Sequence, residues 1–351
     1  MSTITILGAG VMGSSMCLPA RDRGHAVRLV GTHLDAAIID SVKATGLHPR
    51  LSVKLPEGTT AFHHDEFAAA LSDDTDLIIL GISSAGVSWA IDHLCEALAR
   101  PVPVVMITKG MQPEDTGLKA LPDHVAAEVR RRRGFDLTIA AIGGPCIAGE
   151  LAVRRHTGTV ITSHDMDFAA SVCAMLETDY YHPRVSPDVI GVEICAAFKN
   201  FFAIAVGWAA GHLEKMAETP NRAFNHNAAA IVFDQAIREL MVLVRAHGGT
   251  EQSVWGMPGA GDLYVTCQAG RNSRLGNNLG RGLTYRQTKD GPMKGDTIEG
   301  AELGITVAAA LRAMMSKGVL AAGSLPLTSA LLDALTQDTP LVIPWTAFHR
   351  S

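Results

Sequence analysis

Hydrophobic and polar residues follow different patterns in the two halves of the chain. In the first half, short aliphatic and β-branched runs alternate with longer amphipathic stretches. This alternation predicts a doubly wound, mainly parallel sheet with helices between its strands. Strands are expected at Thr3–Leu7, Ala26–Val30, 77–80, 104–107 and 137–142, with weaker signals at 160–162 and 180–181, and helices at 13–23, 83–99 and 117–132.

The second half lacks this alternation. Long apolar-periodic segments at 190–215, 225–247, 297–318 and 326–337 predict an all-α domain. We therefore expect an α/β domain at 1–187 followed by a helical domain at 188–351, as the length of 351 residues also favours. A segment rich in Gly, Asn and Arg, 256–282, is predicted to be a functional loop with a short helix.

Composition and charge exclude several classes of function. The chain is 47% hydrophobic with a formal net charge of −5, which is typical of a globular protein and argues against a nucleic-acid partner. The basic run at 130–133 is interpreted as the last turn of a helix that begins near Asp115, where cations complement the helix dipole. The six cysteines form no C-x-x-C pair and no cluster with histidine, so no metal site is expected.

The start of the chain and its most apolar run indicate where the protein is located. The first strand begins almost at Met1, which leaves no room for a signal peptide. The most apolar run, 194–210, contains Lys199 and Asn200, so no membrane span is expected. We therefore expect a cytoplasmic protein without a membrane partner. The unusually apolar helical half is consistent with a homodimer.

A glycine motif at the start of the chain predicts a nucleotide site. Residues 4–13 read ITILGAGVMG, an apolar strand followed by G-x-G-x-x-G and a helix that begins with Val11 and Met12. In a Rossmann dinucleotide-binding domain, Gly8 would make the tight turn, Gly10 would admit the pyrophosphate and Gly13 would let helix and strand pack closely. A chance glycine-rich turn does not account for the strand before the motif and the helix after it.

The end of the second strand bears on the choice between NAD and NADP. A carboxylate there would bind the ribose 2′-hydroxyl of NAD. The residues at 31–33 are Gly, Thr and His, and Asp35 lies slightly beyond them. The absence of a carboxylate favours NADP over NAD, with His33 or Arg28 near the 2′-phosphate.

Two charged residues in the second half, Lys199 and Asp262, are candidates for catalytic roles. Lys199 lies in an apolar helix beside Phe198, where a lysine is costly to bury unless it is paired or functional. Either its ammonium reaches water along a buried stem, or burial and a neighbouring cation lower its pKa from about 10.4 so that it exchanges a proton with a carbinol oxygen. Asp262, bracketed by glycines, is interpreted as a presented carboxylate or as a helix N-cap.

Further polar groups complete a candidate site. Thr266, Arg271 and Asn272 offer a hydroxyl, a guanidinium and an amide, a set suited to phosphate or vicinal hydroxyls. Lys109 follows an apolar strand and so lies at a strand carboxyl end, where open α/β sheets bind ligands. The sequence Gly-Gly-Pro-Cys at 143–146 also follows a strand and leads to Ala148.

These motifs together resemble the NAD(P)-dependent glycerol-3-phosphate dehydrogenase family over nearly the whole chain. GAGVMG, TKG at 108, GPCIAGE at 144, GVEICAAFKN at 191 and GDLYVTC at 261 occur in the family's order. The resemblance implies that Lys199 is the catalytic lysine, and that Lys109 binds substrate and lowers the pKa of Lys199. It also implies that Asp262 positions Lys199 and the substrate hydroxyls. It further implies a phosphate site at Thr266, Arg271 and Asn272 with Asn227 near it, and a cofactor site formed by Gly8, Gly10, Val11, Met12, Gly13, His33, Ala148 and Glu299.

The resemblance implies oxidation of sn-glycerol 3-phosphate to dihydroxyacetone phosphate with NAD or NADP. Two other hypotheses compete with this activity. One is the same chemistry on another polyol phosphate, sugar or sugar acid, and the other is a cofactor-binding regulator without turnover. The first is motivated by the run between Cys267 and Arg271, two residues shorter than in familiar members. Other departures are Cys146 in place of a hydroxyl, Ile82 in place of a proline, and Gln235 in place of an arginine.

Overall fold

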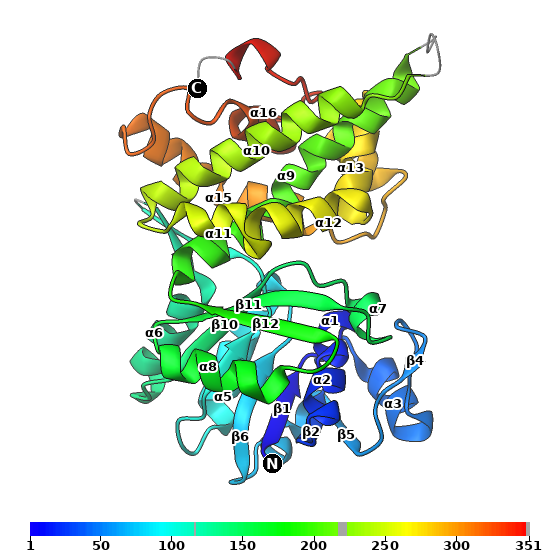
Figure 1. The fold of residues 1–351 in the computed structure, drawn as a ribbon, viewed down its shortest axis with the longest axis vertical. Helices are drawn as coiled ribbons and strands as arrows, with labels where there is room; N and C mark the ends of the chain where they lie inside the picture. The colour runs from blue at the N-terminus through cyan, green and yellow to red at the C-terminus, as the bar shows by residue number, and fades with distance from the viewer. Residues whose placement is uncertain (116, 217–222, 349–351) are drawn as a thin grey trace. The chain divides into compact units, whose positions relative to one another are not determined.

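The computed structural model describes residues 1–115, 117–216 and 223–348, which form two compact units (Figure 1). Unit 1 consists of Met1–Lys109 and Leu121–Val189. Unit 2 consists of Gly110–Ala120 and Ile190–Ser351. The short segment Gly110–Ala120 therefore groups with the helical unit, although it lies within 1–187.

Unit 1 is built on a mainly parallel sheet, as the sequence predicted. Within the described residues the sheet has eight strands in the order β12-β11-β10-β7-β6-β1-β2-β5. All neighbouring strands are parallel except β10 and β11. The strands are β1 (Thr3–Leu7), β2 (Ala26–Val30), β5 (Thr59–Phe62), β6 (Thr75–Leu80), β7 (Val104–Met106), β10 (Ile139–Gly143), β11 (Thr157–Ser163) and β12 (Tyr181–Ser186).

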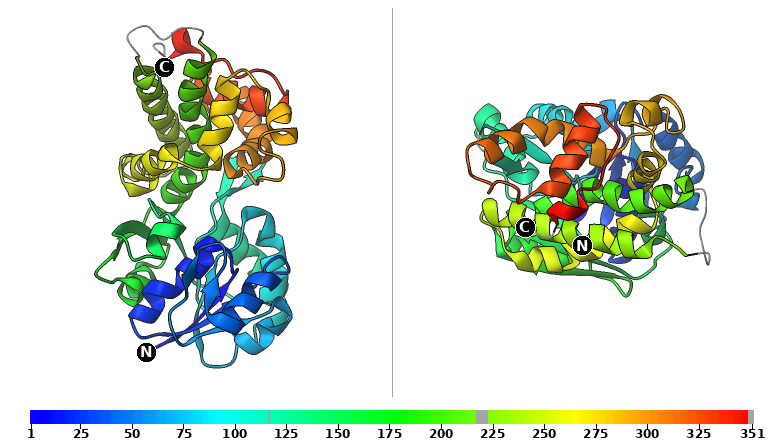
Figure 2. Two further views of the ribbon diagram at one scale, coloured as in Figure 1. Left: turned by 90° about the vertical axis from the view of Figure 1, so that its right-hand side faces the viewer. Right: turned by 90° about the horizontal axis from the view of Figure 1, so that it is seen from above.

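Helices cover both faces of this sheet because its strands are apolar on both sides (Figures 1 and 2). On one face, Ile4 and Ile6 pack with apolar residues of α2, α3 and α8. On the other face, Leu7 and Leu80 pack with residues of α4, α5 and α6. The helices are α1 (Val11–Ser15), α2 (Cys17–Asp22), α3 (Ala36–Thr45), α4 (Phe67–Ala70), α5 (Val87–Ala97), α6 (Leu121–Arg133), α7 (Ala148–Leu151) and α8 (Met166–Leu176).

The helix expected from about Asp115 is wrong in its first part. Strands β8 (Met111–Glu114) and β9 (Gly117–Ala120) form an antiparallel hairpin, and α6 begins only at Leu121. Met111 and Leu118 are buried in the core of unit 2. Tertiary burial of these apolar side chains thus overrides the helical pattern of the segment.

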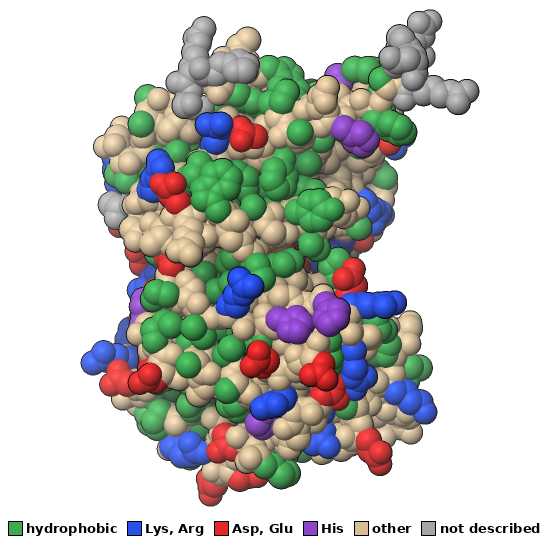
Figure 3. Space-filling view, in the orientation of Figure 1, with side chains coloured by type: hydrophobic (Ala, Val, Ile, Leu, Met, Phe, Trp, Pro, Cys, Tyr) green, Lys and Arg blue, Asp and Glu red, His purple; other side chains and the backbone are tan. Residues whose placement is uncertain are grey.

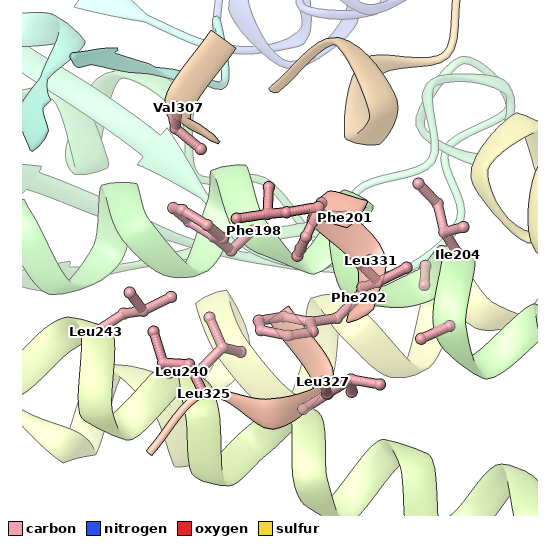
Figure 4. Packing of buried hydrophobic residues seen from close by; sticks show 14 of the residues in the cluster. Phe198, Phe201, Phe202, Ile204, Leu240, Leu243, Val307, Leu325, Leu327 and Leu331 are labelled. Atoms are coloured by element: carbon pink, nitrogen blue, oxygen red, sulfur yellow. The ribbon is translucent and has the colours of Figure 1, made fainter. Parts of the chain in front are cut away.

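Unit 2 is helical around the long α9 (Val189–Lys215). Figure 4 shows Phe198, Phe201 and Phe202 of α9 packed among leucines of neighbouring segments. Phe201 and Phe202 meet edge to face with ring centroids 5.4 Å apart. The other helices are α10 (His226–Ala246), α11 (Glu251–Trp255), α12 (Asp262–Gln268), α13 (Arg271–Gly280), α14 (Tyr285–Asp290), α15 (Glu299–Ser316) and α16 (Pro326–Thr336).

Helices α9 and α13 approach closely through glycines. A Cβ atom added at Gly211 would overlap the carbonyl oxygen of Asn277, and one added at Gly276 would overlap that of Ile204. The segment 256–282 is accordingly not the loop that its composition suggested. It consists of a π-helical turn at Met257–Gly261 followed by α12 and α13, because glycines such as Gly276 and Gly280 serve helix packing.

Helix α9 is long and apolar enough by composition to cross a membrane. In the structure, 89% of its most apolar stretch is buried within the protein. This is the behaviour of a core helix in a folded domain.

Candidate active site

The glycine turn after β1 is held by close backbone contacts in unit 1. Gly8 has a φ of +111°, and a Cβ atom there would lie 2.6 Å from the carbonyl oxygen of Gly81. A Cβ atom at Gly13 would overlap the carbonyl oxygen of Gly8. Around Gly10, by contrast, a Cβ atom would meet nothing within 4 Å among the described residues. The turn thus leaves open the one position that a dinucleotide pyrophosphate requires, and the residues present fit this cofactor.

Asp35, the carboxylate nearest the end of β2, is engaged within the protein. It is buried, and its Oδ2 accepts hydrogen bonds from the main-chain N–H of Ala9 at 3.2 Å and of Thr32 at 2.8 Å. The Thr32 hydroxyl donates to the same oxygen at 2.8 Å. Asp35 therefore supports the glycine turn through three hydrogen bonds to its Oδ2.

The basic residues considered for the 2′-phosphate differ in their environment. His33 is exposed and lies edge to face with Trp89, with ring centroids 6.0 Å apart. Arg28 points its guanidinium at Asp74, with an Nη2–Oδ2 distance of 3.0 Å, and also donates to Ser72. The guanidinium of Arg28 is therefore engaged in an ion pair, and its place near the phosphate stays a prediction.

Other predicted residues of unit 1 lie along the carboxyl edge of the sheet. Lys109 follows β7 and is half-buried. Thr108 beside it donates to the carbonyl oxygen of Ile82 at 3.0 Å, which joins the ends of β6 and β7. The carbonyl oxygen of Ala148 accepts a hydrogen bond of 2.8 Å from Ser15, which ties α7 to α1.

The charged residues of unit 2 meet as an ion pair. The Nζ of Lys199 donates to Oδ1 of Asp262, and the two side chains are only 8% and 1% exposed. Lys199 comes from the middle of α9, and Asp262 is the first residue of α12. An ammonium in an apolar helix is thus compensated by a carboxylate that the chain delivers from a separate element.

A chain of polar contacts lies next to this pair in the sequence and in space. The Nδ2 of Asn272 donates to Oδ1 of Asn200 at 3.1 Å, and the Nδ2 of Asn200 donates to Oε2 of Glu299 at 3.1 Å. Arg271 pairs with the other oxygen of Glu299 at 3.4 Å. The Oδ1 of Asn272 accepts from the N–H of Gly300 at 2.9 Å. Four side chains from three helices are thereby fixed relative to each other.

A two-residue turn brings the candidate phosphate ligands together. Helix α12 ends at Gln268 and α13 begins at Arg271, and Gly270 between them has a φ of +119° that favours glycine. Ser273 donates to the carbonyl oxygen of Thr266 at 2.9 Å across the turn. Thr266 itself donates to the carbonyl oxygen of Asp262 at 2.7 Å. The turn therefore holds the main chain of α12 at Thr266 against the start of α13.

Comparison with known proteins agrees with this geometry. Residues 3–169 match the model of the NAD-dependent glycerol-3-phosphate dehydrogenase N-terminus, and residues 188–342 match the model of its C-terminus. The chain is 34% identical over 287 residues to the NADP(+)-dependent glycerol-3-phosphate dehydrogenase of Archaeoglobus fulgidus, covering 82% of each chain. The chain belongs to the NAD-dependent glycerol-3-phosphate dehydrogenase family. It is accordingly an NAD(P)-dependent dehydrogenase acting on a CH–OH group.

Two further relatives cover almost the whole chain. The glycerol-3-phosphate dehydrogenase [NAD(P)+] of Halorhodospira halophila is 30% identical over 344 residues, covering 97% of this chain and 94% of the relative. The crystal structure of glycerol-3-phosphate dehydrogenase from Coxiella burnetii superposes with a TM-score of 0.80 at 25% identity, covering 99% of this chain and 98% of that one. The resemblance inferred from the motifs and the predicted fold class are thereby confirmed.

The departures from the family pattern have local explanations in part. Gln235 donates to Glu239 at 2.9 Å on the same helix. Glu239 in turn accepts from the N–H groups of Leu327 and Thr328 at the start of α16. A glutamine in place of the family's arginine therefore supports a buried helix cap. Nothing in the structure explains why Cys146 replaces a hydroxyl.

Asn227 lies apart from the contacts described above. It is exposed on the first turn of α10, whereas Asn225, the N-cap of that helix, donates to the carbonyl oxygen of Ala209 at 2.9 Å. Cys267 adds no nucleophile, because burial raises the pKa of its thiol to about 12.

Sequence reasoning missed two residues that the structure places in these sites. Gly81 follows β6, and its Cβ would lie 2.8 Å from the Cα of Gly13, so it permits the glycine turn. Asn200 links Asn272 to Glu299. The sequence did carry a signal for each residue. Gly81 directly follows an apolar strand, and Asn200 is an amide beside Lys199 in an apolar helix.

Proposed function

We propose that this family member interconverts dihydroxyacetone phosphate and sn-glycerol 3-phosphate, with Lys199 as the group that exchanges the proton. The observation that carries this assignment is the buried pair of Lys199 and Asp262. A structural lysine on an apolar helix would reach water along its stem, and this one instead meets a carboxylate from another helix.

The roles in the reaction follow from charge. NAD(P)H supplies the hydride when it is bound. As the carbonyl carbon accepts that hydride, negative charge develops on the carbonyl oxygen, and Lys199 donates a proton from Nζ to that oxygen. Asp262 orients the ammonium and compensates its charge. In the oxidation direction, Lys199 takes the proton back from the hydroxyl.

The phosphate group of the substrate is assigned to the start of α13. Arg271 stands at the first position of this helix, where free N–H groups and the helix dipole favour an anion. Its guanidinium forms only a half-exposed ion pair of 3.4 Å with Glu299 and can bind a phosphate dianion more strongly. Thr266 and Asn272 complete this assignment. Asn227 is proposed to lie near the phosphate.

The remaining assignments concern unit 1 and the cofactor. Lys109 is proposed to bind substrate, because it follows β7 at the carboxyl edge of the sheet. Gly8, Gly10, Gly13, Val11 and Met12 are proposed to hold the pyrophosphate, with His33 at the adenosine end and Ala148 and Glu299 also near the cofactor. The inward-facing carboxylate of Asp35, bonded to the main chain of Ala9 and Thr32, supports a preference for NADP.

A second candidate is the same chemistry on another polyol phosphate, sugar or sugar acid. The two-residue turn at Ala269–Gly270 favours it, because a shorter turn changes the space around Arg271. Rates of reduction with a series of ketose phosphates and unphosphorylated ketoses separate the two candidates. A cofactor-binding regulator without turnover needs no buried lysine pair.

We further propose a cytoplasmic homodimer without a nucleic-acid or membrane partner. Figure 3 shows hydrophobic side chains gathered over α10, α11 and α12. Trp255 of α11 and Tyr264 of α12 are 59% and 61% exposed, which is unusual for large aromatic side chains in solvent. Sedimentation equilibrium tests this assignment, and a monomer at micromolar concentration would overturn it.

The deciding experiment is oxidation of NADH and NADPH by the purified protein with dihydroxyacetone phosphate. Rapid oxidation is expected, faster with NADPH. Cofactor binding without oxidation would transfer the assignment to another ketose phosphate or an unphosphorylated ketose. No cofactor binding would overturn the proposal.

A further inference from the structure

The β8–β9 hairpin continues the chain directly after Lys109. Lys109 ends its segment of unit 1, and the hairpin belongs to unit 2. Within unit 2 the hairpin packs against α15, and its Met111 and Leu118 side chains are buried in the core. Only Gly110 separates Lys109 from Met111, so their Cα atoms lie within about 7 Å of each other. The main chain of Lys109 therefore follows the position of the hairpin.

A histidine at the end of α10 holds one strand of this hairpin. His247 is the half-buried C-cap residue of α10, and its Nε2 accepts a hydrogen bond of 3.1 Å from the main-chain N–H of Leu118. Its Nδ1 lies 2.8 Å from the carbonyl oxygen of Leu243, one turn back along the helix. Because Nε2 accepts, the proton of the neutral ring is on Nδ1 and is donated to Leu243. Both ring nitrogens are engaged, which fixes the imidazole between α10 and β9.

This hydrogen bond supplies a direction that the apolar contacts of the hairpin lack. Burial of Met111 and Leu118 stabilises the docked hairpin, but the hydrophobic effect is not directional and does not fix the hairpin along its length. In a two-stranded hairpin, alternate N–H groups point away from the partner strand and need another acceptor. His247 provides that acceptor for Leu118, and a hydrogen bond has a preferred length and angle. His247 therefore sets the position of β9 on α10.

We propose that His247 is a positioning residue for the reaction and acts through the hairpin on Lys109. The inference rests on the proposed function, in which Lys109 binds the substrate. A displacement of about 1 Å in a group that positions the substrate can cost about 100-fold in rate. Loss of the hydrogen bond to Leu118 therefore weakens substrate binding through Lys109. The cofactor's glycine turn belongs to unit 1 and is left unchanged.

Calorimetric titration of sn-glycerol 3-phosphate into the protein saturated with NADPH tests the proposal without turnover, because both molecules are in the reduced form. In His247→Asn the shorter amide still reaches the carbonyl oxygen of Leu243 but not the N–H of Leu118. The dissociation constant of sn-glycerol 3-phosphate is expected to rise roughly three- to tenfold, as for the loss of one hydrogen bond. His247→Gln, whose longer side chain can accept from Leu118, is expected to restore it to within about twofold of wild type. NADPH affinity should be unchanged in both variants.

His212→Asn is the matched control. His212 is a half-buried histidine of the same unit, and its ring stacks on Trp208 of α9. This substitution should change the affinity for sn-glycerol 3-phosphate by less than about twofold. An equal loss of affinity in His212→Asn and His247→Asn would show a general loosening of unit 2 and would overturn the inference.

A double-mutant cycle with Lys109→Met tests whether the effect of His247 passes through Lys109. If it does, adding His247→Asn to Lys109→Met should weaken binding no further. Fully additive losses, or unchanged affinity in His247→Asn, would overturn this inference alone. Unchanged affinity in Lys109→Met, or no binding by wild type, would overturn it together with the proposed function.

Hydrogen exchange of the Leu118 amide checks the structural step independently of ligand binding. The amide should be protected in wild type and in His247→Gln, and it should exchange roughly three- to tenfold faster in His247→Asn. Rapid exchange of this amide in wild type would overturn the proposal even if a variant failed to fold.

Discussion

Lys199 and Asp262 form an ion pair across 63 positions of sequence, and neither side chain is more than 8% exposed. The desolvation of two charges is costly, and a buried pair of this kind is often no more stable than well-packed apolar residues. Its presence in a core lined with Phe198, Phe201 and Phe202 is therefore better explained by chemistry than by stability. Substitutions of Lys199 and Asp262 separate the contribution of the pair to catalysis from its contribution to stability.

Lys199→Met should abolish turnover and leave cofactor affinity almost unchanged, because the cofactor turn belongs to unit 1. It should also lower the free energy of unfolding by about 3–5 kcal/mol, since the buried carboxylate of Asp262 loses the ammonium of Lys199. The double variant Lys199→Met with Asp262→Asn should regain most of that stability and remain inactive. Equal loss of turnover and cofactor affinity would show that the lysine is structural.

Arg271→Ala should raise KM for a phosphorylated substrate roughly 10- to 100-fold with a much smaller change in kcat, because it removes a charge-assisted contact with the phosphate. Arg274→Ala is the matched control: it lies one turn along α13 and pairs with Asp296 at 3.5 Å. Steady-state kinetics compares the two variants. An unchanged KM in Arg271→Ala would refute the phosphate assignment.

The stability of wild type should fall relative to His48→Gln as the pH decreases. Burial lowers the pKa of His48 in the folded state, whereas the unfolded chain titrates near about 6.5. The stabilisation from neutral His48 is therefore complete above the unfolded value and is lost as the pH falls below it. Urea unfolding at several pH values between about 5 and 8 measures the difference, in which the buried His25, common to both proteins, cancels. Parallel pH profiles would contradict this prediction.

Gly211→Ala should destabilise unit 2 by about 1–3 kcal/mol, because the added methyl group overlaps the Asn277 carbonyl oxygen and forces α9 and α13 apart. Ala210→Ser, at the exposed neighbouring position, should change the free energy of unfolding by less than about 0.5 kcal/mol. Thermal or denaturant unfolding followed by circular dichroism checks both values. A neutral Gly211→Ala would mean that the two helices can separate without cost.

Local patterns of apolar residues were sufficient to predict the parallel sheet and the long helices. The runs LIIL at 77–80 and IAAI at 139–142 are buried on both faces of the sheet, so they are continuous and easily recognised. The helix expected at 117–132 was predicted to begin too early, because the short hairpin that precedes α6 is buried against a distant helix and has no periodicity of its own. The segment at 256–282 was predicted to be a loop with a short helix, whereas α12 and α13 occupy most of it, because glycines such as Gly276 and Gly280 serve close helix packing.

The sequence by itself determined the glycine turn, the unusual lysine of α9 and the polar set at Thr266, Arg271 and Asn272, because each is a local departure from an apolar or helical background. Only the tertiary structure decided which groups they meet. It paired Lys199 with Asp262, inserted Asn200 between Asn272 and Glu299, and turned Asp35 inward onto Ala9. Partners that are tens of residues apart are selected by packing and desolvation across the whole core, and no short stretch of sequence encodes those energies.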